Sequence, residues 1–193
     1  MKIKIGIFGS AVNESPRATQ IAKSLGMELG KIGDSIILIN GACAGVPYEV
    51  ANTARSVSPI EIWGFSPELS KEDHQKVYPN IDVSMYAKLI YMPESFELAR
   101  DEMARKKYRN IMSTAHCDGG IIVSGRWGTM NEFTNLYDME KVIGVLTGTG
   151  GVADGLRELH TKIQKPNKAV VFFENSPGVL VERMLTEVKG RKP

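Results

Sequence analysis

The chain has 193 residues, of which 42% are hydrophobic and 24% are charged, and its formal net charge is +2 at pH 7. These values are ordinary for a globular protein and predict one domain over residues 1–193 with a sizeable core. The charge is too mild to indicate binding to nucleic acid or to a membrane surface, and no apolar run is long enough to predict a membrane-spanning helix.

Short apolar runs alternate with helical patterns along the whole chain. The expected strands lie at residues 3–8, 35–39, 60–65, 87–92, 120–123, 141–146 and 168–173. The expected helices follow them at residues 16–31, from 46 through 54, at 96–116, at 128–139, up to about 163, and at 177–188. Strands that alternate with helices predict parallel pairing through right-handed crossovers. We therefore expect an α/β fold, a Rossmann-like doubly wound parallel sheet of about seven strands with helices on both faces.

Some of these elements carry signals for their ends or their faces. Ser15 and Pro16 suit the N-cap and the first residue of the first helix. The polar segment from Glu68 to Asn80 is expected to be a surface excursion, and a flap over a ligand site is one role for it. The helix at 96–116 is expected to use apolar positions at Leu98, Met103, Tyr108, Met112 and Ala115.

Four glycine-rich turns follow expected strands, at Gly9–Ser10, Gly41–Gly45, Gly125–Gly128 and Gly148–Gly151. The carboxyl ends of parallel strands lie along one edge of a sheet, and ligands bind in the crevice where the strand order reverses. Four permissive turns at one edge favour a nucleotide-sized ligand. For Asn40–Pro47 alone, tight helix packing and a ligand-facing loop remain equally good interpretations. No G-x-G-x-x-G opens the first helix and no G-x-x-x-x-G-K-[ST] is present, so neither NAD nor a P-loop is predicted.

The stretch from Cys117 to Phe133 contains the central turn of the expected site. An expected strand ends in the run Ser124-Gly-Arg-Trp-Gly-Thr129, and a helical pattern follows. A buried strand, a glycine turn and a helix start make an anion site, because unpaired amide groups and the helix dipole converge there. Glu132 falls three residues after Thr129. Two interpretations stay open: an ordinary helix start with the capping box Thr129-x-x-Glu132, or a phosphate cradle with a carboxylate over a bound sugar.

Cysteine and histidine usage indicates neither a disulfide framework nor a metal site. Cys43 and Cys117 lie far apart without CxxC spacing, so each is expected to be a small buried residue. The three histidines show no metal-ligand spacing. The first apolar run is short and interrupted by lysine, which is unlike a signal peptide. We expect a cytoplasmic protein without a metal or a cofactor.

These residues together resemble the Lonely Guy family, a group once mislabelled lysine decarboxylases. The family's central motif reads PGGxGTxxE, with an arginine on the preceding helix. The matching positions here are Gly125, Gly128, Thr129 and Glu132. Ser124 stands for the proline and Arg126 for the second glycine, and Arg109 precedes Glu132 by 23 positions, as in the family. The resemblance covers residues 3 to about 173.

Two features are more similar to a neighbouring branch that includes the molybdenum cofactor carrier proteins. Asn110 follows Arg109 where many Lonely Guy members have lysine, and the turn Thr147–Gly151 also fits that branch better. The resemblance implies a Rossmann-like fold, a homodimer and a nucleotide or similar phosphorylated small-molecule ligand. A binding or carrier protein without turnover is therefore the alternative to an enzyme.

For the Lonely Guy members, the resemblance implies hydrolysis of a nucleoside 5′-monophosphate to free base and ribose 5-phosphate. Glu132 would stabilise positive charge on the ribose, hold its hydroxyls or orient the water, and Arg109 would keep Glu132 ionised or contact the ligand. These two residues are the expected catalytic pair. The expected phosphate- and nucleotide-binding residues are Gly9, Ser10, Gly41, Gly45, Gly125, Arg126, Gly128 and Thr129. No lysine is framed for pyridoxal phosphate, so decarboxylation is not expected.

Overall fold

The structure, a computed structural model, describes residues 2–12, 15–163 and 165–191. Its strands are β1 (Ile3–Gly9), β2 (Ile36–Asn40), β3 (Glu61–Phe65), β4 (Lys88–Ile90), β5 (Gly119–Val123), β6 (Val142–Leu146) and β7 (Val170–Glu174). Its helices are α1 (Pro16–Ile32), α2 (Val46–Val57), α3 (Lys71–Val77), α4 (Glu102–Ala115), α5 (Trp127–Asp138), α6 (Gly151–Lys162) and α7 (Pro177–Arg191). Short 3₁₀ turns lie at Gly33–Ser35 and Val83–Met85.

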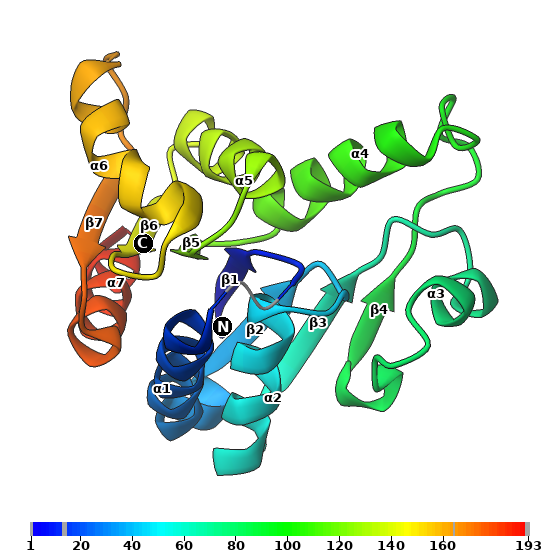
Figure 1. The fold of residues 1–193 in the computed structure, drawn as a ribbon, viewed down its shortest axis with the longest axis horizontal. Coiled ribbons are helices and arrows are strands. Elements are labelled where there is room, and N and C mark those ends of the chain that lie inside the picture. The colour runs from blue at the N-terminus through cyan, green and yellow to red at the C-terminus, as the bar shows by residue number, and fades with distance from the viewer. Residues whose placement is uncertain (1, 13–14, 164, 192–193) are drawn as a thin grey trace.

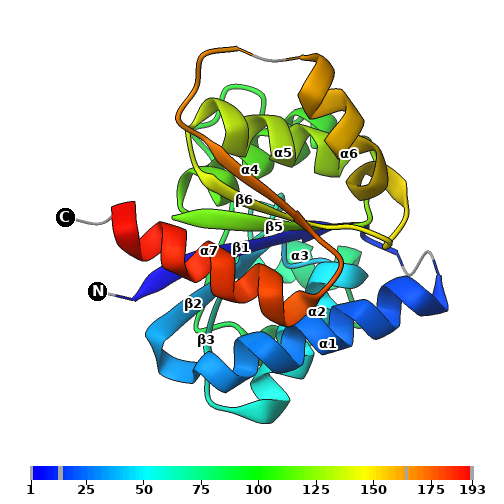
Figure 2. The same ribbon diagram turned by 90° about the vertical axis from the view of Figure 1, so that its left-hand side faces the viewer.

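Within the described residues, seven strands form one all-parallel sheet in the order β4-β3-β2-β1-β5-β6-β7. Helices α1, α2 and α7 cover one face and α4, α5 and α6 cover the other, as Figures 1 and 2 show from two directions. The expected α/β, Rossmann-like, doubly wound sheet is therefore confirmed. The strand order reverses between β1 and β5, where Gly9 pairs with Val123 at the carboxyl ends of the two strands.

The sheet is buried on both sides, which is why its strands read as nearly continuous apolar runs. In β1, Ile5 and Ile7 belong to the core beneath α1, α2 and α7, whereas Phe8 belongs to the core on the opposite face. Gly6 leaves room for that ring, because a methyl group at Gly6 would lie 2.3 Å from the Phe8 side chain. The first helix begins as expected, with Pro16 at its start and the Ser15 hydroxyl accepting the Ala18 amide.

Helix α4 begins six residues later than expected and buries different side chains. Its N-cap is Asp101, whose carboxylate accepts the amides of Met103 and Ala104. The expected apolar face was wrong at Met103, which is 64% exposed, and at Leu98, which precedes the helix and is also exposed. The buried side of α4 carries Asn110, Ser113 and Thr114, small or polar residues that let α4 and α5 pack closely.

The segment expected to be a surface excursion is anchored. Glu68 is buried and forms an ion pair with Arg105 of α4 at 3.1 Å, and the same arginine donates to the carbonyl of Pro67. His74 of α3 is fully buried, with its Nδ1 2.8 Å from the Ser66 hydroxyl. The prediction missed these anchors because polar side chains that pair with each other in the interior look the same in sequence as solvated ones.

Candidate functional site

A cavity of about 150 Å³ opens at the carboxyl ends of β1 and β5, at the reversal of strand order. Eight of the ten predicted site residues line it: Gly9, Ser10, Gly41, Arg109, Arg126, Gly128, Thr129 and Glu132. They come from the end of β1 and the loop after it, the β2–α2 loop, α4, and the N-cap and first turns of α5. Residues up to 123 positions apart in sequence therefore meet in one place, as expected for ligand sites in open parallel sheets.

The start of α5 supplies the backbone amides of this cavity. Its N-cap is Arg126, and the helical bonding begins with the Met130 amide donating to the Arg126 carbonyl at 2.9 Å. The amides of the first three helical residues, 127–129, thus precede the helical ladder and suit an anion. A methyl group at Gly128 would meet nothing within 4 Å, so there is open space beside the helix start.

The capping-box interpretation of Thr129 and Glu132 is wrong. Because Arg126 is the N-cap, Thr129 is the third residue of the helix, and a box would need its hydroxyl at the N-cap position. The side chains of Thr129 and Glu132 instead lie one turn apart on the face of α5 that lines the cavity. The helix starts at Trp127, one residue earlier than the sequence predicted.

Gly125 shapes the site without lining the cavity. The turn at Ser124 and Gly125 has left-handed backbone at both residues, with φ of 54° and 99°. A methyl group at Gly125 would lie 2.4 Å from the Thr129 hydroxyl. Glycine is needed there because the turn folds tightly back on the helix that it introduces.

The fourth glycine-rich turn, between β6 and α6, supports that turn from behind and is absent from the cavity lining. The Thr149 hydroxyl accepts the Ser124 amide at 2.8 Å and donates to the Leu146 carbonyl at 2.7 Å. The first amides of α6 are also used, because Val152 and Ala153 donate to the carbonyls of Gly125 and Ser124. The expectation that all four turns face the ligand is thus corrected.

The remaining amides of the β6–α6 turn are used within the turn itself. The Asp154 carboxylate accepts the amides of Gly148 and Gly150 at 2.6 and 3.0 Å. A methyl group at Gly151 would lie 2.3 Å from the Gly125 carbonyl oxygen, so the two turns are in direct contact. The start of α6 therefore has its own carboxylate and the neighbouring carbonyls as partners.

Gly45 also belongs to the scaffold of the site and not to the cavity wall. It is the N-cap of α2 with φ of 92°, and a methyl group there would lie 2.3 Å from the Ser10 carbonyl oxygen. That same carbonyl accepts the Val46 amide at 2.9 Å. Both earlier interpretations of the 40–47 turn therefore apply to different residues: Gly45 packs against the β1–α1 loop, whereas Gly41 faces the cavity.

Arg109 reaches the cavity from α4 and is held by the backbone of the β2–α2 loop. Its Nη1 donates to the Gly41 carbonyl at 2.8 Å. Its Nε is buried and has no hydrogen-bond partner among the described residues. Arg109 forms no ion pair with Glu132 within the described parts of the chain, although its charge favours the ionised carboxylate through space.

Glu132 is the acidic group of the cavity, and only 7% of its surface is exposed. Burial raises the pKa of its carboxyl from 4.5 to about 7, because desolvation outweighs the opposing attraction of Arg109 and Lys107. The charge of Arg109 thus favours the ionised form of Glu132, as expected, but its effect on the pKa is smaller than that of burial. A carboxyl that titrates near neutrality can take or give a proton at working pH, which an ordinary glutamate does poorly.

Besides the predicted site residues, five others line the cavity: Ile7, Ala11, Cys43, Pro47 and Asn110. Cys43 is half-buried and lines it, so the expectation of a buried residue was wrong for Cys43 and right for Cys117. Asn110 lines it as well, next to Arg109 on α4. The signal for Cys43 was available, because it lies between the two glycines of a turn that follows a strand.

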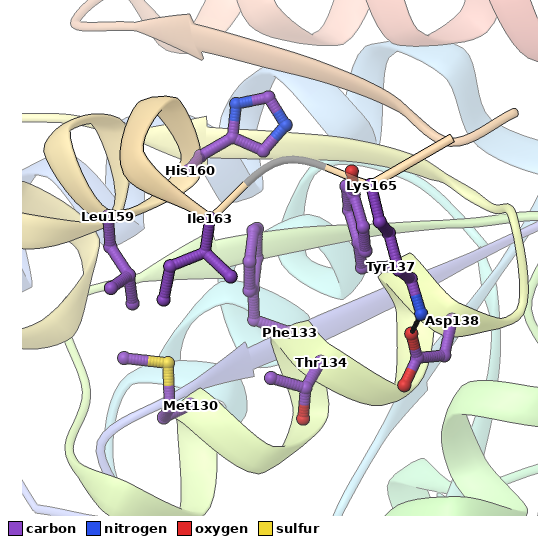
Figure 3. Close-up of a pocket in the computed structure, with 9 residues that line it drawn as sticks. All are labelled: Met130, Phe133, Thr134, Tyr137, Asp138, Leu159, His160, Ile163 and Lys165. Atoms are coloured by element: carbon purple, nitrogen blue, oxygen red, sulfur yellow. Dashed lines mark hydrogen bonds and ion pairs between the residues drawn. The ribbon is translucent and has the colours of Figure 1, made fainter. Parts of the chain in front are cut away.

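A second cavity, of about 220 Å³, lies on the other side of α5. Figure 3 shows its apolar walls, with Phe133 and Tyr137 from α5 facing Leu159 of α6 and Ile163, the residue that follows α6. Lys165 forms an ion pair with Asp138 at its rim. None of the predicted site residues lines this cavity, and it lacks the helix start and the buried carboxyl of the first one.

Neither a metal cluster nor a membrane span is found in the described residues. No three side chains of histidine, cysteine, aspartate or glutamate gather there to hold a metal ion. Within the same described ranges, no helix is both long enough and apolar enough to cross a membrane.

Comparison with protein families gives one match over nearly the whole chain. The family model described as LDcluster4, SLOG cluster4 family, matches residues 2–181. Among curated proteins, no relative matches the sequence. The matched range contains every residue that lines the cavity at the switch point.

Solved structures of low sequence identity share the fold. The protein TM1055 is 18% identical with a TM-score of 0.74, over 97% of this chain and 99% of that one. The molybdenum cofactor binding protein from Rippkaea orientalis is 16% identical with a TM-score of 0.69, over 97% and 98% of the two chains. The molybdenum cofactor carrier protein from Chlamydomonas reinhardtii is 17% identical with a TM-score of 0.64, over 98% and 100%.

Proposed function

Because this chain belongs to the SLOG cluster4 family, we propose that its switch-point cavity binds a phosphorylated, nucleotide-type small molecule and hydrolyses its N-glycosidic bond. The proposed substrate is a nucleoside 5′-monophosphate, and the products are the free base and ribose 5-phosphate. The observation that carries the proposal is Glu132, a buried carboxyl with a pKa of about 7 that shares a cavity with the start of α5.

The phosphate is proposed to lie at the start of α5. The amides of residues 127–129 and the positive end of the helix dipole suit an anion there. Arg109 and Arg126 also line the cavity and add positive charge. Two arginines and one carboxyl that is half neutral near pH 7 give a site that favours a dianion.

The bond cleavage needs a base and a stabiliser of positive charge, and both fit Glu132. In the proposed step, a water oxygen attacks C1′ of the ribose while the C1′–N bond breaks and its electron pair leaves with the base. Glu132 takes the proton of the water, and the departing nitrogen is protonated by solvent. The carboxylate also stabilises the oxocarbenium-like charge that develops on the sugar.

The size of the cavity supports partial enclosure of such a ligand. About 150 Å³ is below the roughly 300–1,000 Å³ of ordinary small-molecule sites. The cavity is thus proposed to enclose the sugar and phosphate, with the base extending through the mouth. That arrangement places the sugar ring, where the reaction occurs, beside Glu132.

A second candidate is a carrier on the same fold that holds its ligand without turnover. Two structural neighbours are named for carrying or binding the molybdenum cofactor, and this chain resembles them in fold. Arg126, where a Lonely Guy member has glycine, lines the cavity and distinguishes it from the motif of the hydrolytic members. In this candidate a phosphate group of the ligand would lie at the start of α5, as it does in the proposed hydrolase.

One assay separates the two candidates. The protein is incubated with AMP, GMP, CMP and UMP, and free base is measured by chromatography; base release that Glu132→Gln abolishes supports hydrolysis. Glu158→Gln, at an exposed position on α6, is the matched control and should retain full activity. Tight nucleotide binding without base release would instead favour the carrier, and absence of both would overturn the proposal.

A further inference from the structure

Asn110 is a buried amide at the junction between α4 and the start of α5. Asn110 is only 4% exposed, and it lines the cavity at the switch point. Its Nδ2 donates to the Asn131 Oδ1 at 3.0 Å and to the Gly128 carbonyl at 3.5 Å. Since a backbone carbonyl can only accept, the contact with Gly128 fixes which end of the amide faces α5.

This orientation leaves the Oδ1 of Asn110 without a partner. It is buried, and no described group donates a hydrogen bond to it. Buried polar atoms are nearly always hydrogen-bonded, so an unsatisfied acceptor in a cavity wall needs an explanation. The neighbouring Arg109 leaves a buried donor, its Nε, equally unsatisfied. A ligand hydroxyl group could donate a hydrogen bond to the Asn110 Oδ1 and could accept one from the Arg109 Nε.

The position of Asn110 suggests which part of a ligand meets it. Its amide contacts Gly128, the second residue of α5, so it lies beside the amides proposed to hold the phosphate. The group next to the phosphate in a nucleotide is the sugar, and the small cavity encloses little else. Glu132 of α5 lines the same cavity as Asn110 of α4.

We propose that Asn110 is a specificity-determining residue, whose Oδ1 accepts a hydrogen bond from a ribose hydroxyl and so selects ribose over deoxyribose ligands. This inference rests on the proposed binding of a sugar phosphate at the α5 start. A site built around a hydroxyl rejects an analogue without it, because the buried partner is then left unpaired. Because Oδ1 is buried in the unliganded protein, a ribose hydroxyl reaches it only if the Asn110 amide turns toward the cavity.

The test uses sugar phosphates, because they lack the N-glycosidic bond and cannot be consumed. Affinities for ribose 5-phosphate, 2-deoxyribose 5-phosphate and 3-deoxyribose 5-phosphate are measured by calorimetry. We expect the intact protein to bind at least one deoxy compound about tenfold more weakly than ribose 5-phosphate. Asn110→Leu should bring that ratio close to one while affinity for inorganic phosphate is unchanged.

Two further variants keep the result interpretable if Asn110→Leu folds poorly. Asn110→Asp retains an acceptor oxygen, so it should keep the ribose preference while weakening all three sugar phosphates equally through its added charge. Asn131→Ala removes only the partner of Nδ2, and the preference should survive it. An undiminished preference in Asn110→Leu, or equal binding of all three compounds by the intact protein, would overturn the inference.

The failure of this inference is distinguishable from failure of the proposed function. If AMP releases base but neither deoxy compound loses affinity, the proposed function stands and the role of Asn110 is wrong. If none of the sugar phosphates binds and no base is released, both are overturned.

Discussion

The Nη1 of Arg109 hydrogen-bonds the Gly41 carbonyl at 2.8 Å, and a methyl group on Gly41 would lie 1.6 Å from that same nitrogen. Arg109 comes from α4 and Gly41 from the loop after β2, so one glycine allows the arginine to lie flat against a loop from another part of the sheet. The absence of a side chain at Gly41 therefore allows Arg109 to take its position in the cavity lining.

The first prediction concerns Gly41→Ala. The clash falls on the far end of a flexible side chain, so Arg109 should swing away and the free energy of unfolding should change by less than about 1 kcal/mol. Affinity for the phosphorylated ligand should fall roughly tenfold or more, because a charge-assisted contact is lost. Gly155→Ala, on an open face of α6, is the control and should leave binding unchanged. Unaltered binding by Gly41→Ala would show that Arg109 does not hold the ligand.

The second prediction follows from the raised pKa of Glu132 and concerns stability. The folded-state pKa is about 7 and the ordinary value is 4.5, so between these pH values the folded state binds more protons than the unfolded state. Stability contributed by this group is therefore present at low pH and is lost as pH rises from about 4.5 to about 7. The full loss is on the order of 3 kcal/mol.

Glu132→Gln removes this pH dependence. Denaturant unfolding should show the variant to be more stable than the parent at pH 8, with a gap that narrows as pH falls toward 4.5. The exposed Glu158→Gln should show no such gap. If the free energies of unfolding of the parent and of Glu132→Gln change with pH in the same way from pH 5 to pH 8, then burial does not raise the pKa of Glu132.

The third prediction concerns the rate of base release. A general base must be ionised, so kcat/KM for a nucleoside monophosphate should rise with pH and level off above about 7, where Glu132 of the free enzyme has lost its proton. Arg109→Lys should shift this midpoint, because the attraction that opposes desolvation changes its geometry. A rate that is flat between pH 5 and pH 8.5 would assign the base to another group.

How far the sequence predicted the fold can be judged from the strands and the helix starts. The strands were placed to within a few residues because a sheet covered on both faces leaves long apolar runs. The glycines that follow β1 and β5 located loops at the ends of these strands, whereas the position of the switch point is seen only in the strand order of the structure. The start of α4 was missed because the Asp101 cap competes with an apolar pattern that begins before it.

The site shows a different limit, since its supports depend on contacts between distant segments. Gly125 and Gly151 both read as ligand-facing glycines, yet the structure places them against each other. Glu132 was identified from its position three residues after Thr129 and from the motif resemblance, but its pKa near 7 depends on burial that no local pattern reveals. A motif therefore identifies the residues of a site more reliably than it identifies the role of each residue.

The last prediction tests whether the β6–α6 turn positions the start of α5. Thr149→Val keeps the shape of the side chain but removes the hydroxyl that accepts the Ser124 amide and donates to the Leu146 carbonyl. Two lost buried hydrogen bonds should lower the free energy of unfolding by roughly 1–3 kcal/mol. The left-handed turn at Ser124 should also loosen, so ligand affinity should fall several-fold, measured well below the unfolding temperature, even though Thr149 does not line the cavity. Thr149→Ser keeps the hydroxyl and should restore affinity. Equal affinity in the valine and serine variants would mean that the turn keeps its shape without this support, and that the amides of α5 are positioned by the helix alone.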